Sequence, residues 1–261
     1  MMQQRIGFRV MMKTPSVVWG ILVFVAAMSV AQAGCDDPPQ RGVNWIGCDK
    51  SGVDLRNADL RRALLNRVNF SGANLSGANL RDAKLGNADF SNANLQGATL
   101  VDASMGTADF SKANLNKAHL DNARLSRTNM QQAQLQGASL RGAKAYSILL
   151  NDADLTEAVL DRAVMDRAEL KNARLDQASL QEVSLIQANL EATSFLGASL
   201  FKARLDETSL IDAVFTGADL TKANFYRADI MDAVFDDAVM SHTIWLNRER
   251  CKRDSVGECR H

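Results

Sequence analysis

The sequence is poor in the bulky side chains that fill the core of an ordinary globular domain. Only 6% of its 261 residues are aromatic, and it contains three prolines. Apolar residues nevertheless make up 46% of the chain, which is too many for a disordered protein. Alanine and leucine must therefore form most of the interior.

The sequence also lacks an excess of charge of either sign. Its 30 Lys and Arg residues balance 30 Asp and Glu residues, so that the formal net charge is zero. This balance argues against a strongly basic nucleic-acid-binding protein. It argues equally against a polyanion that imitates nucleic acid over its whole surface.

The first 33 residues have the order of a secretory signal peptide. Arg5, Arg9 and Lys13 precede any acidic residue, residues 17–30 are almost purely apolar, and the A-x-A sequence of residues 31–33 follows. The apolar run falls short of the ~20 residues that a membrane-spanning helix needs. We therefore expect cleavage after Ala33, no membrane span in the mature chain, and a periplasmic or secreted protein.

A lipoprotein is the alternative for this segment. Cys35 follows a small residue, Gly34, as a lipidated cysteine does. Gln32, however, stands where lipidated precursors usually have leucine, so the sequence favours the cleaved signal peptide.

From Val53 to Trp245 the sequence repeats every five residues without insertion or deletion, most visibly in the SGANLSGANL of residues 71–80. Every position ending in 0 or 5 from Leu55 to Trp245 is Leu, Phe, Met, Ile or Trp, except Ala145. The position two places earlier is mostly Ala, otherwise Val, Thr or Ile. A period of five fits neither a helix nor an alternating strand. Each unit must instead turn a corner, with one large and one small side chain inward and three outward.

This A-(N/D)-L-x-x pattern resembles the pentapeptide-repeat family over about three quarters of the chain. The resemblance implies an all-β fold: a right-handed quadrilateral parallel β-helix of about ten coils, in which four pentapeptides make one square coil. The cysteine-containing segments 42–48 and 243–251 resemble the terminal caps of exported members. We therefore divide the chain into four parts, namely signal peptide 1–33, N-terminal cap 34–52, β-helix 53–247 and C-terminal cap or tail 248–261.

The phenylalanines offer an independent test of a twenty-residue coil, since stacked coils place residues twenty apart on one face. Of the seven Phe residues at the large inward positions, only Phe225 lies outside two series spaced by twenty. The series are Phe70, Phe90 and Phe110, and Phe195, Phe215 and Phe235. At about 4.8 Å per coil, the β-helix would be roughly 45 Å long.

The four cysteines allow three disulfide pairings. In a β-helix of this length the two ends lie tens of ångströms apart, whereas bridged Cα atoms must lie within about 7 Å. We therefore expect Cys35–Cys48 and Cys251–Cys259, each closing a short loop at one end. A metal site would need a further ligand cluster, which the sequence lacks, so no metal or cofactor is predicted.

Two residue preferences outside the core have structural explanations. Glycine recurs at the second outward position after the large residue, as at Gly72, which suits a tight corner. Asn or Asp often precedes the large residue, as at Asn74, where the side chain can bond nearby backbone.

In residues 143–148 a small residue takes the large position, Ala145, and a bulky one takes the small position, Ile148. Mutual compensation of volume is favoured over a functional kink.

The unbroken period lets the outward residues be sorted onto four faces. The basic face, centred on the column from Leu65 to Trp245, has a net charge of +5 because eight basic residues oppose three acids. The acidic face, centred on Phe70 to Ile230, has a net charge of −6 because two basic residues oppose eight acids. The other two faces carry about −3 and about zero. The basic residues of the basic face are Arg67, Lys84, Arg124, Arg127, Lys144, Arg167, Arg204 and Arg227, and both tyrosines, Tyr146 and Tyr226, lie among them.

A row of Arg and Lys with interspersed aromatics predicts a binding site for an elongated anionic partner, such as an acidic glycan, a phosphate-rich envelope polymer or the acidic edge of an envelope protein. The alternative is that outward residues are simply solvated and that the asymmetry arose by chance.

Outward apolar residues become more frequent in the C-terminal half, as at Leu196 and Met231. They suggest contact with another chain, a second copy included. Because they fall on all four faces, relaxed selection on the surface of a repeat is the alternative.

An enzyme is the class least supported by the sequence. His119, His242 and His261 are scattered, the inward positions hold no nucleophile, acid or base, and a convex rod offers no deep pocket.

The best-known members of the family shield topoisomerases from quinolones as DNA mimics, but an export signal and a basic face contradict that role here. We predict a non-catalytic exported scaffold or a module that binds protein or polyanion, with no nucleic acid partner. A DNA-mimicking gyrase inhibitor or protector is the alternative.

Overall fold

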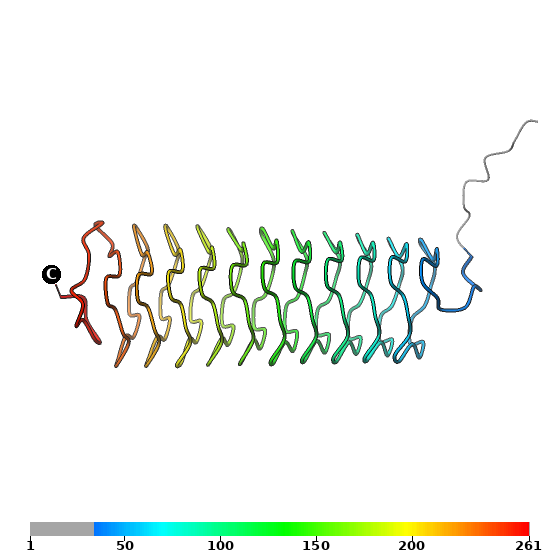
Figure 1. The fold of residues 1–261 in the computed structure, drawn as a ribbon, viewed down its shortest axis with the longest axis horizontal. Helices are drawn as coiled ribbons and strands as arrows, with labels where there is room; N and C mark the ends of the chain where they lie inside the picture. The colour runs from blue at the N-terminus through cyan, green and yellow to red at the C-terminus, as the bar shows by residue number, and fades with distance from the viewer. Residues whose placement is uncertain (1–33, 261) are drawn as a thin grey trace, which may run out of the picture. The chain divides into compact units, whose positions relative to one another are not determined.

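The computed structural model describes residues 34–260, and the predicted signal peptide lies outside these described residues. Within them the chain winds as a continuous four-sided coil (Figure 1). Residues 34–260 contain no helix, hence none long and apolar enough to cross a membrane, and no strand longer than one bridged residue. Each side of the coil consists of two turn residues followed by three extended residues, of which the middle one forms the bridge.

The lap of the coil is twenty residues. Parallel bridges join Asn44 to Leu64, Leu64 to Lys84, and so on along the same side to Ile244. The other three sides carry equivalent ladders. On each side one backbone N–H bonds to the next coil, as Leu65 N does to Lys84 O at 2.8 Å, and another to the previous coil, as Lys84 N does to Ala63 O at 2.9 Å. Consecutive coils are therefore held together on all four sides.

The corners are type II turns. At each corner the N–H of the small residue donates to the carbonyl of the preceding large residue, as Ala63 N does to Leu60 O at 3.1 Å. The second corner residue has a positive φ, which is 64° at Gly72 but also 58° at Arg62. The predicted contact of Asn and Asp with nearby backbone is confirmed, because Ser71 N donates to Asn69 Oδ1 at 2.9 Å.

The interior is filled by the large and small inward residues, nearly all of which are fully buried. The predicted phenylalanine series are confirmed as stacks: Phe90 and Phe110 lie 4.6 Å apart, and Phe195 and Phe215 lie 4.8 Å apart, between ring centroids. Phe225, outside both series, meets the edge of Phe215 at 5.9 Å. Within each series, rings that stack on consecutive laps exclude the voids that isolated rings would leave.

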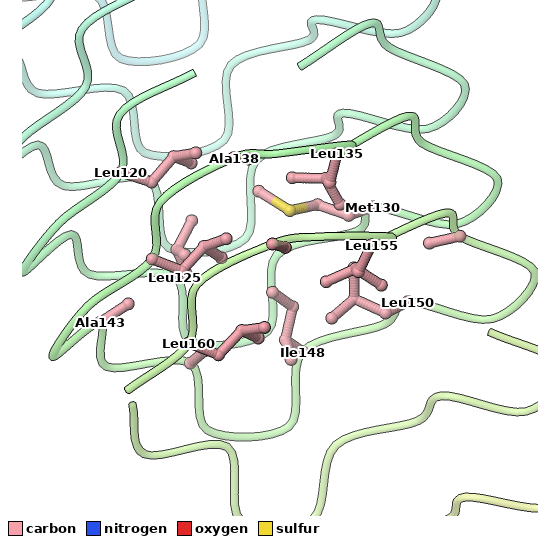
Figure 2. Packing of buried hydrophobic residues seen from close by; sticks show 14 of the residues in the cluster. Leu120, Leu125, Met130, Leu135, Ala138, Ala143, Ile148, Leu150, Leu155 and Leu160 are labelled. Carbon is pink, nitrogen blue, oxygen red and sulfur yellow. The ribbon is translucent and has the colours of Figure 1, made fainter. Parts of the chain in front are cut away.

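Ala145 and Ile148 are both buried, and the bridges on either side of them are intact. Figure 2 shows Ile148 pointing into the interior between Leu150 and Leu160. The added volume at residue 148 thus takes the space that Ala145 leaves, and the coil continues without a kink, as the sequence predicted.

At the N-terminal end the regular coil already begins at residue 41. Lys50 occupies a large inward position, but its ammonium lies 4.3 Å above the Trp45 ring and donates to Cys35 O at 2.5 Å. The predicted pair Cys35–Cys48 forms, with Cα atoms 5.5 Å apart.

An exposed ion pair follows shortly after this end. The Arg61 guanidinium, hydrogen-bonded to Asp59, lowers the pKa of that carboxyl to about 2.

At the C-terminal end the chain reverses after Trp245. Residues 249–257, which we name the return segment, run antiparallel to the last coil, with bridges from Ile244 to Arg250 and from Val239 to Val256. The predicted pair Cys251–Cys259 forms, with a Cα–Cα distance of 5.0 Å. The return segment, red in Figure 1, therefore covers only the two sides centred on Met240 and Trp245.

Candidate binding face

The basic face is built from two columns of exposed side chains. Lys84, Arg124, Lys144 and Arg204 stand on bridge positions in the middle of one side. Arg67, Arg127, Arg167 and Arg227 are the second residues of the adjoining corner, where φ is 58–59°. Because every lap repeats the same geometry, the eight cations point outward along one strip of the rod.

The densest part of this strip lies on three consecutive laps. Arg124 and Lys144 are bridge partners, and Arg127 N donates to Tyr146 O at 2.9 Å. The guanidinium carbon of Arg167 lies 5.6 Å from the centre of the Tyr146 ring. We name these five residues the central cluster. Tyr146 is 38% exposed, so an aromatic surface is available among four cations.

Ion pairing distinguishes the basic face from the rest of the rod. Elsewhere many cations meet carboxylates on the neighbouring lap, as Arg162 meets Glu182 at 3.2 Å and Lys171 meets Glu191 at 2.7 Å. On the basic face the described residues form two ion pairs, both near its C-terminal end: Arg204–Asp206 at 3.9 Å and Arg227–Glu207 at 3.7 Å.

The six cations from Arg67 to Arg167 form no ion pair within the described chain. Asp166 lies on the same strip, but its Oδ1 accepts from Ser184 Oγ at 2.5 Å and from Ile186 N at 3.2 Å. Arg167 donates to the neutral side chain of Gln187 at 3.0 Å. The positive charge of this stretch is therefore uncompensated by the protein itself.

The C-terminal end of the strip contains cations that the repeat pattern could not reveal. Arg248 lies 4.2 Å above Tyr226, on which Arg227 also packs at 4.9 Å. Arg248 and Arg250 line a hollow of about 290 Å³ together with Asp206, whose Oδ2 is buried without a hydrogen bond. Both arginines follow the last pentapeptide, so their place on the face depends on where the chain reverses.

Another hollow, of about 520 Å³, lies at a different corner. It opens where Gly142 has no side chain, and its walls alternate in sign, with Arg141 near Asp161 at 3.8 Å and Arg162 near Glu182. It holds no nucleophile paired with a base. No group of three or more His, Cys, Asp or Glu side chains in residues 34–260 could hold a metal ion.

The comparisons with known proteins agree with this geometry. The pentapeptide-repeat family model matches in eight copies over residues 41–72, 73–111, 108–144, 149–181, 178–217 and 198–237. No curated protein matches the chain.

Several solved structures are similar to the chain, among them HetL and QnrB1. HetL, a pentapeptide repeat protein involved in heterocyst differentiation regulation from the cyanobacterium Nostoc sp. strain PCC 7120, is 30% identical. The match covers 81% of this chain and 90% of HetL, with a TM-score of 0.42. Full-length QnrB1, a plasmid-mediated fluoroquinolone resistance protein, is 20% identical over 71% of this chain and 92% of its own, with a TM-score of 0.52.

The family matches and the likeness to QnrB1 imply that the four-sided coil is a right-handed quadrilateral β-helix. Proteins of this kind are generally non-catalytic. The matched residues, the twenty-residue lap and the identity with HetL together show that the chain belongs to the pentapeptide-repeat family.

Proposed function

We propose that this protein is a non-catalytic, exported binding module whose basic face holds an elongated anionic polymer. The observation that carries the proposal is the run of six cations from Arg67 to Arg167 that form no ion pair in the described chain, on a rod that elsewhere pairs many of its cations. A polyanion lying along the strip would supply the missing negative charge.

The arrangement of the charges favours a polymer over a small anion. Lys84 and Arg124 stand two laps apart, as do Arg127 and Arg167, which is roughly 10 Å at about 4.8 Å per lap. A small anion needs several donors that converge on one point, and a convex surface does not provide them. A chain with regularly repeated carboxylates, sulfates or phosphates can meet successive cations, while Tyr146 offers an amphipathic contact between them.

The absence of catalysis is supported by the composition of the interior and of the hollows. The buried polar side chains of the described residues are threonines and serines, and Thr128, for example, donates to Met105 O at 2.9 Å. Thr193 and Thr243 likewise donate to the previous lap, whereas Thr208 donates to Leu205 O within its own corner. A water-excluding pocket with convergent acid and base groups is what catalysis would require.

Export is supported by the cysteines and by the sequence of residues 1–33. The described chain has no free cysteine, because both pairs form disulfides. Disulfides of this kind persist in oxidising compartments such as the periplasm or the extracellular space.

The test is binding of labelled polyphosphate and heparin to the purified protein at low and high salt. Reversing the charge in Arg124→Glu, Arg127→Glu and Arg167→Glu should weaken binding at least about tenfold, and added salt should weaken the wild type. The matched control reverses three ion-paired arginines, Arg62, Arg141 and Arg162, and changes the net charge equally. Equal binding by wild type and by the cluster variant would refute the proposal.

The DNA-mimic alternative has one observation in its favour, the acidic face beside the basic one. Several of its carboxylates are already engaged, since Asn129 Nδ2 donates to Asp109 at 3.1 Å and Asn172 Nδ2 to Asp152 at 3.0 Å. Inhibition of gyrase supercoiling by the purified protein would support this alternative, whereas an unaffected reaction would eliminate it.

A further inference from the structure

One side of the rod changes from polar to apolar on its last laps, which are yellow and orange in Figure 1. It is the side whose large inward residues run from Leu55 to Phe235. From Ser71 to Ser194, the bridge residue of this side and the first residue of each adjoining corner are polar on every lap. Beyond Ser194, five apolar residues occupy these positions, and we name them the apolar patch: Leu196, Ile211, Val214, Met231 and Val234.

The apolar patch is one continuous surface. Val214 and Val234 are bridge partners, and Ile211 and Met231 stand twenty residues apart at the corner that leads into the same side. Leu196 precedes Val214 by eighteen residues. Outward side chains with this spacing touch on neighbouring laps, as several hydrogen bonds between residues eighteen apart show. The five side chains are therefore neighbours.

The apolar patch is open to solvent. Met231 is 61% exposed, Leu196 is 43% exposed and Val234 is 38% exposed. Relaxed selection on a repeat surface would scatter apolar residues among the columns, whereas here three adjacent columns change together. Contiguous exposed apolar residues with a polar border are typical of an interaction site.

The border of the apolar patch is acidic. Asp212 and Asp232 are the second residues of the corner before this side, and Asp236 and Asp237 form the corner after it. None of these four carboxylates forms an ion pair within the described chain. The outward positions of this side and its two corners contain no basic residue from residue 191 to residue 237.

The nearest cations of this side do not compensate that charge. Lys171 meets Glu191 at 2.7 Å, and Arg174 meets Asp176 at 3.3 Å. Both pairs lie on the N-terminal side of the apolar patch. The patch thus combines exposed apolar side chains with four uncompensated negative charges.

We propose that the apolar patch binds a cationic amphipathic helix of a partner protein. The patch spans three laps, roughly 10 Å at about 4.8 Å per lap, which matches the diameter of about 10 Å of a helix with its side chains. Leucines at i, i+3 or i+4, and i+7 of that helix would cover the apolar side chains. Lysines and arginines beside them would reach the aspartates of the border.

The backbone of this side favours a helix over an extended peptide. Phe215 N donates to Val234 O at 2.7 Å, and Val234 N donates to Ala213 O at 2.9 Å. Because these backbone groups already join neighbouring laps, the flat surface of the side has no free strand edge. A peptide lying on it gains side-chain contacts alone, which a helix supplies without exposing backbone groups of its own.

The charge of the border selects against two other occupants. Pairing of the apolar patch with the same patch of a second copy would bring acids against acids, and an anionic lipid surface would be repelled in the same way. This inference does not depend on the proposed function of the basic face, because the two surfaces share no residue.

Fluorescence anisotropy with a labelled synthetic peptide tests the proposal. The probe is a helix of about fourteen residues with leucines on one face and lysines elsewhere. One control peptide has glutamate in place of each lysine, and another has the same composition with its leucines spread over all faces. Both should bind the protein at least about tenfold more weakly than the probe. Equal binding of either control peptide would overturn the proposal.

Variants of the apolar patch identify the contact. Leu196→Gln combined with Ile211→Gln introduces a residue type that the same columns hold on earlier laps, so the coil accommodates it. This variant should bind the probe at least about tenfold more weakly, because two apolar contacts are lost. The matched control, Val164→Ser combined with Ile186→Ser on the basic face, should bind as wild type does. Wild-type binding by the patch variant would contradict the proposal.

Neutralising the border tests the charge separately. Asp212→Asn combined with Asp232→Asn should weaken binding of the probe at least about threefold and reduce its dependence on salt. The matched control removes two acids from the same side outside the patch, by Asp152→Asn combined with Glu157→Gln, and should have less than half that effect. Equal effects of the two variants would mean that the probe responds to net charge alone, and the proposal would be wrong.

Sedimentation and vesicle binding distinguish the other occupants. The wild type and the Leu196→Gln, Ile211→Gln variant should have the same oligomeric state and should not bind vesicles of phosphatidylcholine and phosphatidylglycerol. Self-association that the variant abolishes would assign the apolar patch to a second copy. Vesicle binding that the variant abolishes would assign it to a membrane, and either result would overturn the proposal.

Discussion

At the scale of single residues, the corner is the feature that repeats most often. Its second residue has φ near 58° whether it is Arg62, Gln132 or Glu157. For an L-residue this conformation costs about 1–2 kcal/mol, which the hydrogen bonds on both sides of each corner offset. The sequence predicted a tight corner from its glycines. It could not show that long side chains adopt the same backbone, because that depends on neighbouring laps.

Ala192 offers a direct test of this strain. It is an alanine at a corner with φ of 54°. Ala192→Gly should stabilise the protein by about 0.5–1 kcal/mol. Alanine has a steric cost at positive φ that glycine lacks, and this cost exceeds the additional entropy that glycine loses on folding. Urea unfolding measures the change.

The matched control for that variant is Ala188→Gly, at a small inward position that is 2% exposed. There the substitution should destabilise the protein by about 1 kcal/mol, because it removes a buried methyl group and adds chain entropy. Destabilisation by both variants would mean that the corner is unstrained.

At the scale of the structural element, the lap and its aromatic stacks could be predicted closely. Residues twenty apart share a column, so Phe70, Phe90 and Phe110 had to meet. Contacts across the axis could not be predicted in this way. Phe225 meets both Phe215 and Trp245, at 5.9 and 5.5 Å, because rings from adjacent sides converge in the interior.

A double-mutant cycle tests whether a stack behaves as a unit. Phe90→Leu and Phe110→Leu should be coupled by about 0.5–1.5 kcal/mol, since either change alone removes their stacking. Phe90→Leu and Phe215→Leu lie in different stacks, and their effects should add. The measurement is the free energy of unfolding of the four variants in each cycle. Additive effects in the first cycle would show that the rings contribute only buried area.

The two ends illustrate where sequence reasoning stopped. Their disulfide pairings followed from the length of the coil. The antiparallel course of the return segment did not, because no repeat extends beyond Trp245 and strand direction there depends on the hairpin at residues 246–248. For the same reason Arg248 and Arg250 were absent from the predicted basic face.

At the scale of the whole molecule, sorting residues by twenty placed the cations of the basic face in their columns. Some of the ion pairs elsewhere follow the same spacing, as in Arg162–Glu182, and could have been predicted. Others join residues only two apart, such as Arg204–Asp206, and depend on rotamers that the sequence does not specify. Whether a given cation is compensated therefore required the structure.

Deleting whole and half laps tests the map of faces. Removal of residues 87–106 takes out one lap and should leave every remaining column aligned, with Phe70 now stacked on Phe110. Removal of residues 97–106 preserves the pentapeptide pattern but moves all earlier residues to the opposite side. Arg67 and Lys84 would then leave the basic face, and binding of polyphosphate should weaken by more than in the longer deletion. Equal weakening would contradict the map.

Because nearly every backbone hydrogen bond of the coil joins residues about twenty apart or closer, each lap depends only on the one before it. A chain that emerges slowly from its N-terminus can wind each lap as soon as its last residue appears, without waiting for a distant segment. The Cys35–Cys48 loop is the first part to be complete and can serve as the template. Such a protein can fold directionally, and partly made chains should expose little more apolar surface than one growing end.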